Sequence, residues 1–309
     1  MQENQNPQSA LKTTAVAPIT VLKSVLDAPS VQAQFKNALG EHKDAFVASL
    51  IDLFTGDKQL QTCKPAQLIQ EALRAATLKL PLNKALGFAY IVVYNNSAKD
   101  DQGNWIKIPT PTFILGYKGY IQMAMRTGQY RTINADIVYE GEMRKGNKLT
   151  GEILLDGEKT SDKVIGYFCY FELLNGFSKT LYVSVEDMAA YAKKFSPSIK
   201  KTTTVDQLQK LANTTIQTKS VGWEGNFSDM ALKTVVRRLL SKYGYLSVEM
   251  QSALSTEQEE TSRAYLIENA NKEVIATNVE YEEVDEETGE IKNPSQDEDD
   301  APADEEPNY

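Results

Sequence analysis

The spacing of apolar residues changes twice along this chain of 309 residues, and this limits the folds that it can adopt. Up to about residue 80 the apolar side chains recur every three to four positions, as they do in amphipathic helices. Between Phe88 and Val183 short apolar runs separated by glycines indicate strands, with one helix over 117–127. Helical spacing then returns in three segments, 184–194, 205–218 and 228–243. This order predicts an α+β fold with an antiparallel or mixed sheet, packed helices and a helical N-terminal part.

Proline and serine residues indicate how some of these elements begin. Pro109 and Pro111 lie in the apolar run 107–115 and restrict it to an edge strand, because proline has no N–H to donate to a sheet. Ser184 and Ser228 are expected to cap the helices that follow them.

Charge is distributed unevenly along the chain. Of its 42 acidic and 33 basic residues, 19 acidic and 3 basic lie in residues 256–309, a balance of −16. The rest of the chain therefore has 30 basic and 23 acidic residues, a balance of +7. We expect a disordered N-terminus at 1–18, a folded core at 19–250 and a flexible acidic tail at 251–309, because the tail has too few apolar residues to fold. A basic core favours a polyanionic partner.

The motifs that the sequence lacks exclude several classes of protein. It contains neither the phosphate-binding loop of ATPases nor the glycine-rich dinucleotide fingerprint, and it has no Cys-x-x-Cys pair. The single histidine, His42, cannot form a histidine-rich metal site, and Cys63 and Cys169 are expected to be reduced core residues. No apolar run approaches the ~18 residues that a membrane span needs, and no secretory signal is evident. We therefore expect a cytoplasmic protein that acts by binding rather than as an enzyme.

The segment from Gly116 to Arg126 carries both aromatic and basic residues. On a helix, Tyr117 and Tyr120 share one face, while Lys118 and Arg126 lie on another. The glycines at its start could let backbone N–H groups approach a phosphate. The alternative is an ordinary amphipathic helix with a solvated face.

The helix expected over 228–243 carries two rows of cations. Its buried stripe is expected to contain Leu232, Val235, Val236, Leu239 and Tyr243. Lys233 and Arg237 lie along one edge of that stripe, and Arg238 and Lys242 lie along the other. Two such rows suit a polyphosphate backbone. The alternative is that these side chains only extend over the edge of the core.

Five sequence blocks between residues 65 and 245 together resemble the RecT family. They are LNKALGFAYIVVY (82–94), GYKGY (116–120), RTG (126–128), VYEG (138–141) and MALKTVVRRLL (230–240), the last of which follows a tryptophan. Two positions depart from the family pattern, which often has proline where this chain has Val93 and Gly222.

The resemblance implies a phage or prophage protein that binds single-stranded DNA and anneals complementary strands in homologous recombination without ATP. It implies rings or helical filaments of the protein itself, and an annealed duplex as the intermediate. The expected partners are a phage exonuclease and the single-strand-binding protein of the bacterial host. No cofactor is required, and Mg²⁺ would at most modulate DNA binding.

The candidate DNA-contacting residues come mainly from these helices and from a basic loop near residue 200. The candidate backbone contacts are Lys118, Arg126, Arg131, Lys193, Lys194, Lys200, Lys201, Lys233, Arg237, Arg238 and Lys242. The candidate base-stacking residues are Tyr117, Tyr120 and Trp223, and for each of them a place in the core is the alternative.

Two other functions remain open at this point. A metal-dependent nuclease would need clustered carboxylates and a lysine, for which Asp156, Glu158 and Lys159 are a loose candidate. A passive coating protein would bind single strands without accelerating their annealing. The acidic tail is expected to restrain DNA binding or to recruit a partner, with a role in solubility alone as the alternative.

Overall fold

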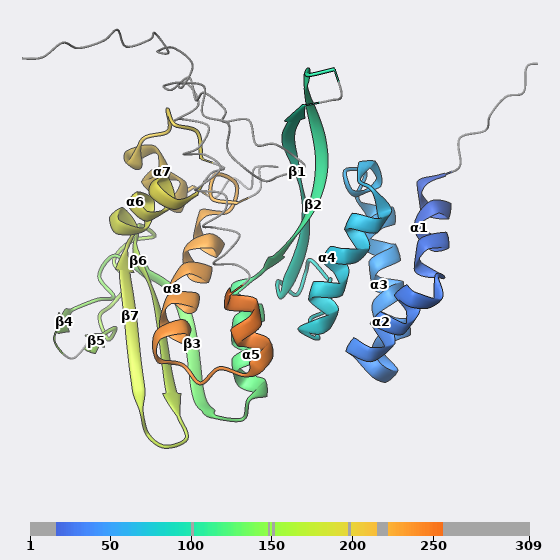
Figure 1. Ribbon diagram of the computed structural model, residues 1–309. Coiled ribbons are helices and arrows are strands. Elements are labelled where there is room, and N and C mark those ends of the chain that lie inside the picture. The colour runs from blue at the N-terminus through green and yellow to red at the C-terminus, as the bar shows by residue number, and fades with distance from the viewer. Residues whose placement is uncertain are drawn as a thin grey trace, which may run out of the picture. The chain divides into compact units, whose positions relative to one another are not determined.

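The computed structural model describes residues 17–99, 102–147, 149, 152–196, 199–214 and 222–255 (Figure 1). The predictions made for residues 1–16 and 256–309 lie outside these ranges. The elements in chain order are α1 (Pro18–Leu26), α2 (Pro29–Leu39), the 3-10 turn η1 (Gly40–His42), α3 (Lys43–Gly56), the 3-10 turn η2 (Leu60–Thr62), α4 (Pro65–Thr77), β1 (Ala89–Lys99), β2 (Trp105–Leu115), α5 (Tyr117–Arg126), β3 (Tyr130–Tyr139), β4 (Lys145–Asn147), β5 (Glu152–Leu154), β6 (Val164–Leu173), β7 (Ser178–Ser184), α6 (Val185–Phe195), α7 (Val205–Ala212) and α8 (Phe227–Tyr243). All the strand pairs described are antiparallel, which confirms the predicted α+β class.

The N-terminal helices α1 to α4 pack through apolar side chains of the predicted helical spacing. Leu22, Phe35, Leu50 and Phe54 are almost completely buried. The α4 helix ends in a Schellman turn, in which the N–H of Leu80 donates to the carbonyl of Ala75 at 3.0 Å and the N–H of Lys79 donates to that of Ala76 at 2.9 Å. The turn requires a left-handed residue, and here it is Lys79, with φ of 54°, rather than a glycine.

The β1–β2 hairpin lies beside α4 (Figure 1). Its register pairs Val93 with Pro111 and Asn95 with Pro109. The N–H of Phe113, two residues beyond Pro111 and so directed to the same edge, donates to the Glu71 carboxylate of α4 at 2.9 Å. Prolines and a side-chain acceptor therefore occupy the outer edge of β2, which confirms its prediction as an edge strand.

The second sheet has the strand order β3–β6–β7. Tyr167, Cys169 and Phe171 on β6 are completely buried on the face that α8 covers (Figure 1). The alternate residues Phe168 and Tyr170 lie on the opposite face and are half-buried. Burial raises the pKa of the Cys169 thiol to about 12, in keeping with the predicted core cysteine.

Helix starts agree only in part with the predictions. Ser184 caps α6 by accepting a hydrogen bond from the N–H of Asp187 at 3.0 Å, as expected. The prediction for Ser228 is wrong, because α8 begins one residue earlier and the Ser228 hydroxyl lies 3.1 Å from that of Tyr167. A complete capping box at the start of α7, formed by Thr204 with Gln207, was not predicted.

The chain remains packed beyond α8. The Tyr130 hydroxyl donates to the carbonyl of Tyr245 at 2.9 Å, and a helical segment follows over 248–255. Met250 and Leu254 in that segment are buried, so packing extends past residue 250, where the core was expected to end. Among the residues described, no helix is both long enough and apolar enough to span a membrane.

Candidate nucleic-acid interface

The two most informative sequence blocks meet in space, because α5 packs against α8. Tyr117 at the start of α5 and Tyr90 on β1 lie near Asp229 in the first turn of α8. Burial, together with the negative charge of Asp229, raises the pKa of both tyrosine hydroxyls. The start of β1, the start of α5 and the start of α8 therefore converge at one place.

The glycines of the GYKGY block allow close packing of two backbone segments at this place. The N–H of Gly116 donates to the carbonyl of Phe88 at 2.9 Å, and the N–H of Gly119 donates to that of Gly116 at 3.0 Å. A Cβ at Gly116 would lie 2.2 Å from the carbonyl oxygen of Gly87. The N–H groups of Gly116 and Gly119 themselves are therefore occupied by the protein's own carbonyls, and a phosphate contact of the other N–H groups at this turn stays a prediction.

The α8 helix presents its cations as two rows, as predicted. Lys233 and Arg237 are half-buried on one side, whereas Arg238 and Lys242 are exposed on the other. Four of the five residues predicted for the buried stripe are buried: Leu232, Val235, Val236 and Leu239. The fifth, Tyr243, is 37% exposed because the helix ends there, so its assignment to the core was wrong.

The fold engages several of the candidate cations, among them Arg126, Arg131 and Lys193. Arg126 donates to the carbonyl of Leu78 at 2.8 Å, at the end of α4. Arg131 pairs with Glu172 at 2.8 Å, and the Lys193 ammonium group donates to the carbonyls of Lys201 and Thr203. Any contact of these three cations with a phosphate would compete with those bonds.

The remaining candidate cations lie at or near the surface. Lys194, Lys200 and Lys201 are exposed around the basic loop, in which Ile199 is buried. The Lys118 ammonium group lies 6.0 Å from the centre of the Tyr117 ring. Residues 197 and 198 of the loop lie outside the described ranges.

Two of the three candidate stacking residues lie in the core, which was the alternative to base stacking. Tyr120 is completely buried and Trp223 is 5% exposed, with its ring centre 5.2 Å from that of Phe227. Tyr117 remains partly exposed. The accessible tryptophan is Trp105 at the start of β2, which is 69% exposed and has the Lys99 ammonium group 5.5 Å from its ring. Sequence reasoning missed Trp105 because it lies in none of the recognised blocks.

Two of the three residues of the nuclease alternative, Asp156 and Lys159, form local ion pairs. Asp156 lies 3.6 Å from Arg144, and Lys159 lies 2.7 Å from Asp162. Lys159 also lies over the ring of Tyr139 at 3.5 Å. In the part of the chain that the structure describes, no three potential ligands among His, Cys, Asp and Glu are gathered where they could hold a metal ion.

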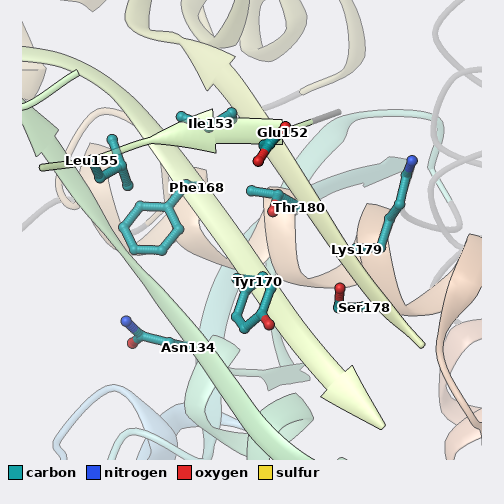
Figure 2. Close-up of a pocket in the computed structure, with 9 residues that line it drawn as sticks. All are labelled: Asn134, Glu152, Ile153, Leu155, Phe168, Tyr170, Ser178, Lys179 and Thr180. Atoms are coloured by element: carbon teal, nitrogen blue, oxygen red, sulfur yellow. The ribbon is translucent and has the colours of Figure 1, made fainter. Parts of the chain in front are cut away.

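A hollow of about 470 Å³ lies on the face of the β3–β6–β7 sheet opposite α8 (Figure 2). Phe168 and Tyr170 of β6 form part of its floor, and Leu155 lies beside Phe168. Glu152 and Lys179 also line the hollow. None of the predicted DNA-contacting residues lines it.

Known proteins match this chain over a region that includes both sequence blocks of the candidate interface, 116–120 and 230–240. A model of the RecT family matches residues 44–276. The chain is 41% identical over 255 residues to an uncharacterized protein, YqaK, of Bacillus subtilis (strain 168), and the match covers 82% of this chain and 78% of that protein. It is 26% identical over 248 residues to protein RecT of Escherichia coli (strain K12), with 77% and 80% covered.

Proposed function

The chain belongs to the RecT family, and from this membership we propose that it binds single-stranded DNA and anneals complementary strands without ATP. Membership supports a role in DNA recombination and strand annealing. The nucleotide-free mechanism, the individual contacts and the partners are our proposals.

The arrangement of cations on α8 is the observation that carries the proposal. Arg238 and Lys242 are exposed on one side of the helix, and Lys233 and Arg237 lie half-buried on the other. Cations placed along a phosphate backbone release condensed counterions, which favours binding regardless of sequence. They also reduce the repulsion between two approaching strands. Base pairing then supplies the free energy of annealing, so no hydrolysis is needed.

The wider assembly follows from the same proposal. Copies of the protein would line a strand as a ring or helical filament and hold the annealed duplex as an intermediate. A phage exonuclease would supply the single strand, and the single-strand-binding protein of the host would be displaced from it. No cofactor would be required, and Mg²⁺ would at most modulate DNA binding.

An annealing assay tests the proposal directly. Two complementary labelled oligonucleotides are mixed with the protein in the absence of nucleotide, with Mg²⁺ or with a chelator. We expect faster annealing in both cases. Binding without acceleration would favour a passive coating protein, Mg²⁺-dependent release of label would favour a nuclease, and a requirement for ATP would refute the proposal.

A pair of charge variants tests the role of α8. Arg237→Ala with Arg238→Ala should weaken binding to all single-stranded sequences alike and flatten the salt slope by up to about two units. The matched control is Arg144→Ala with Lys163→Ala, which removes two cations that pair with carboxylates elsewhere. An equal effect of both variants would indicate that net charge, not the α8 rows, determines binding.

A further inference from the structure

We propose that a surface strip on α6, α8 and β7, in which aromatic rings alternate with cations, binds unpaired nucleotides by stacking bases on the rings and holding phosphates on the cations. This inference rests on the proposed function and extends it to a specific base-binding surface. The ring–cation strip consists of Lys179, Tyr191, Lys194, Phe195, Arg238, Lys242 and Tyr243.

The α6 end of the strip is a pair of rings one helical turn apart. The ring centres of Tyr191 and Phe195 lie 4.8 Å apart, with their planes at 40°. Phe195 is 40% exposed, and the Lys194 ammonium group lies 5.2 Å from its ring. This end therefore offers an accessible aromatic surface with a cation beside it.

The outer row of α8 continues the strip from α6 toward β7. The Arg238 guanidinium carbon lies 5.8 Å from the centre of the Tyr191 ring and so joins the two helices. One turn later, the Lys242 ammonium group lies 5.1 Å from the centre of the Tyr243 ring. The Lys179 ammonium group reaches the same ring from β7 at 5.6 Å. Two cations from different elements thus converge on one exposed ring.

Charge complementarity identifies the occupant as a polyanion with flat apolar groups. Among the residues that the structure describes, no carboxylate forms an ion pair with Lys194, Arg238 or Lys242. The cations lie 5.1–5.8 Å from the ring centres and so put positive charge within reach of the phosphates of a nucleotide bound at the rings. Aromatic stacking tolerates any base, as an annealing protein requires. Duplex DNA hides its base faces, so the strip should favour single strands.

Oligonucleotides with and without bases separate stacking from charge. A thymidine oligonucleotide and an abasic one of the same length carry equal numbers of phosphates, but only the first can stack. The test variant is Phe195→Leu with Tyr243→Leu, which removes two exposed rings and leaves every cation in place. We expect it to bind the thymidine oligonucleotide about fivefold or more weakly than the natural protein. Binding to the abasic oligonucleotide and the salt slope should not change.

Two controls keep the result interpretable. Tyr170→Leu removes a ring from the opposite face of the sheet and should bind both oligonucleotides as the natural protein does. Phe195→Tyr with Tyr243→Phe keeps both rings and should retain full affinity, whereas the leucine variant should not. Thermal unfolding of each variant establishes that the fold is intact.

The possible outcomes distinguish a failure of the ring–cation strip from a failure of the proposed function. Equal losses for both oligonucleotides, or no loss for either, would overturn the strip while leaving annealing by the natural protein intact. A natural protein that neither binds single strands nor anneals them would overturn the proposed function itself. A selective loss for the thymidine oligonucleotide, restored in the ring-retaining variant, would support the strip.

Discussion

Replacing Gly116 by alanine tests the geometry at the start of α5. Gly116 has φ of −78° and ψ of 160°, which alanine adopts freely, so the cost of the change is steric. The new Cβ would lie 2.2 Å from the Gly87 carbonyl oxygen, whereas real Cβ contacts are essentially never under 3.0 Å. Residues 87 and 88 would therefore have to move by about 0.8 Å or more, which strains the hydrogen bond from Gly116 to Phe88.

The magnitude follows from these two effects. Overpacking costs about 1–3 kcal/mol, and a weakened backbone hydrogen bond costs up to about 1 kcal/mol. We therefore expect Gly116→Ala to lower the free energy of unfolding by about 1–4 kcal/mol, a large part of the ~5–15 kcal/mol typical of a folded domain.

Urea unfolding followed by tryptophan fluorescence measures this loss, because Trp223 is buried and becomes exposed on unfolding. The matched control is Gly56→Ala at the end of α3, where nothing lies within 4 Å of an added Cβ. It should be neutral or slightly stabilising, by up to about 1 kcal/mol. If Gly116→Ala stayed within about 0.5 kcal/mol of the natural protein, a spread usual for surface changes, the close approach of residues 87 and 88 to α5 would be refuted.

Four further predictions concern stability and DNA binding. Lys79→Gly should stabilise the protein by about 1 kcal/mol, since glycine adopts the left-handed conformation without strain; an unchanged melting temperature would argue against the Schellman turn. Arg126→Met should lower the free energy of unfolding by about 1–3 kcal/mol, because it leaves carbonyls at the end of α4 unpaired. Its salt slope for DNA binding should not change, and a flatter slope would instead identify Arg126 as a phosphate contact. Burial alone would raise the pKa of Asp57, but hydrogen bonds from Lys84 and the backbone outweigh it and lower that pKa. The charged carboxylate therefore stabilises the fold at neutral pH, and this stabilisation disappears as pH falls through the lowered pKa. Asp57→Asn should be less stable than the natural protein at neutral pH and equally stable in strong acid. A difference in stability that persists in acid would show that the charge of Asp57 is not its cause. Truncation after Ser255 removes a charge of −16 and should tighten single-strand binding at low salt only, whereas weaker binding by the truncated protein would show that the tail helps to hold DNA.

Local patterns were sufficient to predict the type of most elements. Apolar spacing predicted α4 and α8, and two prolines identified β2 as an edge strand. Each of these signals lies within a few residues of the element that it specifies, which is why the chain alone reveals it.

The roles of single side chains at the candidate site depend on distant partners. Arg126 bonds to Leu78 and Arg131 to Glu172, contacts that span 48 and 41 positions of the chain. Ser228 meets Tyr167 across 61 positions instead of capping its own helix. A local sequence pattern cannot reveal contacts between residues so far apart in the chain. The sequence could therefore place cations on helices but could not tell which of them the fold engages.

The outer edge of β2 has a consequence for how copies of this protein can associate. Prolines and the Glu71 carboxylate prevent another strand from adding there, so in the described chain only β1 is left as a pairing edge of the hairpin. Hairpins of two copies can therefore pair only through their β1 edges, and antiparallel pairing of these equivalent edges gives a two-fold dimer that closes on itself. Repeating head-to-tail assembly needs two different complementary surfaces on each subunit. The rings or filaments proposed above would therefore have to grow through contacts other than pairing between the hairpins of neighbouring copies.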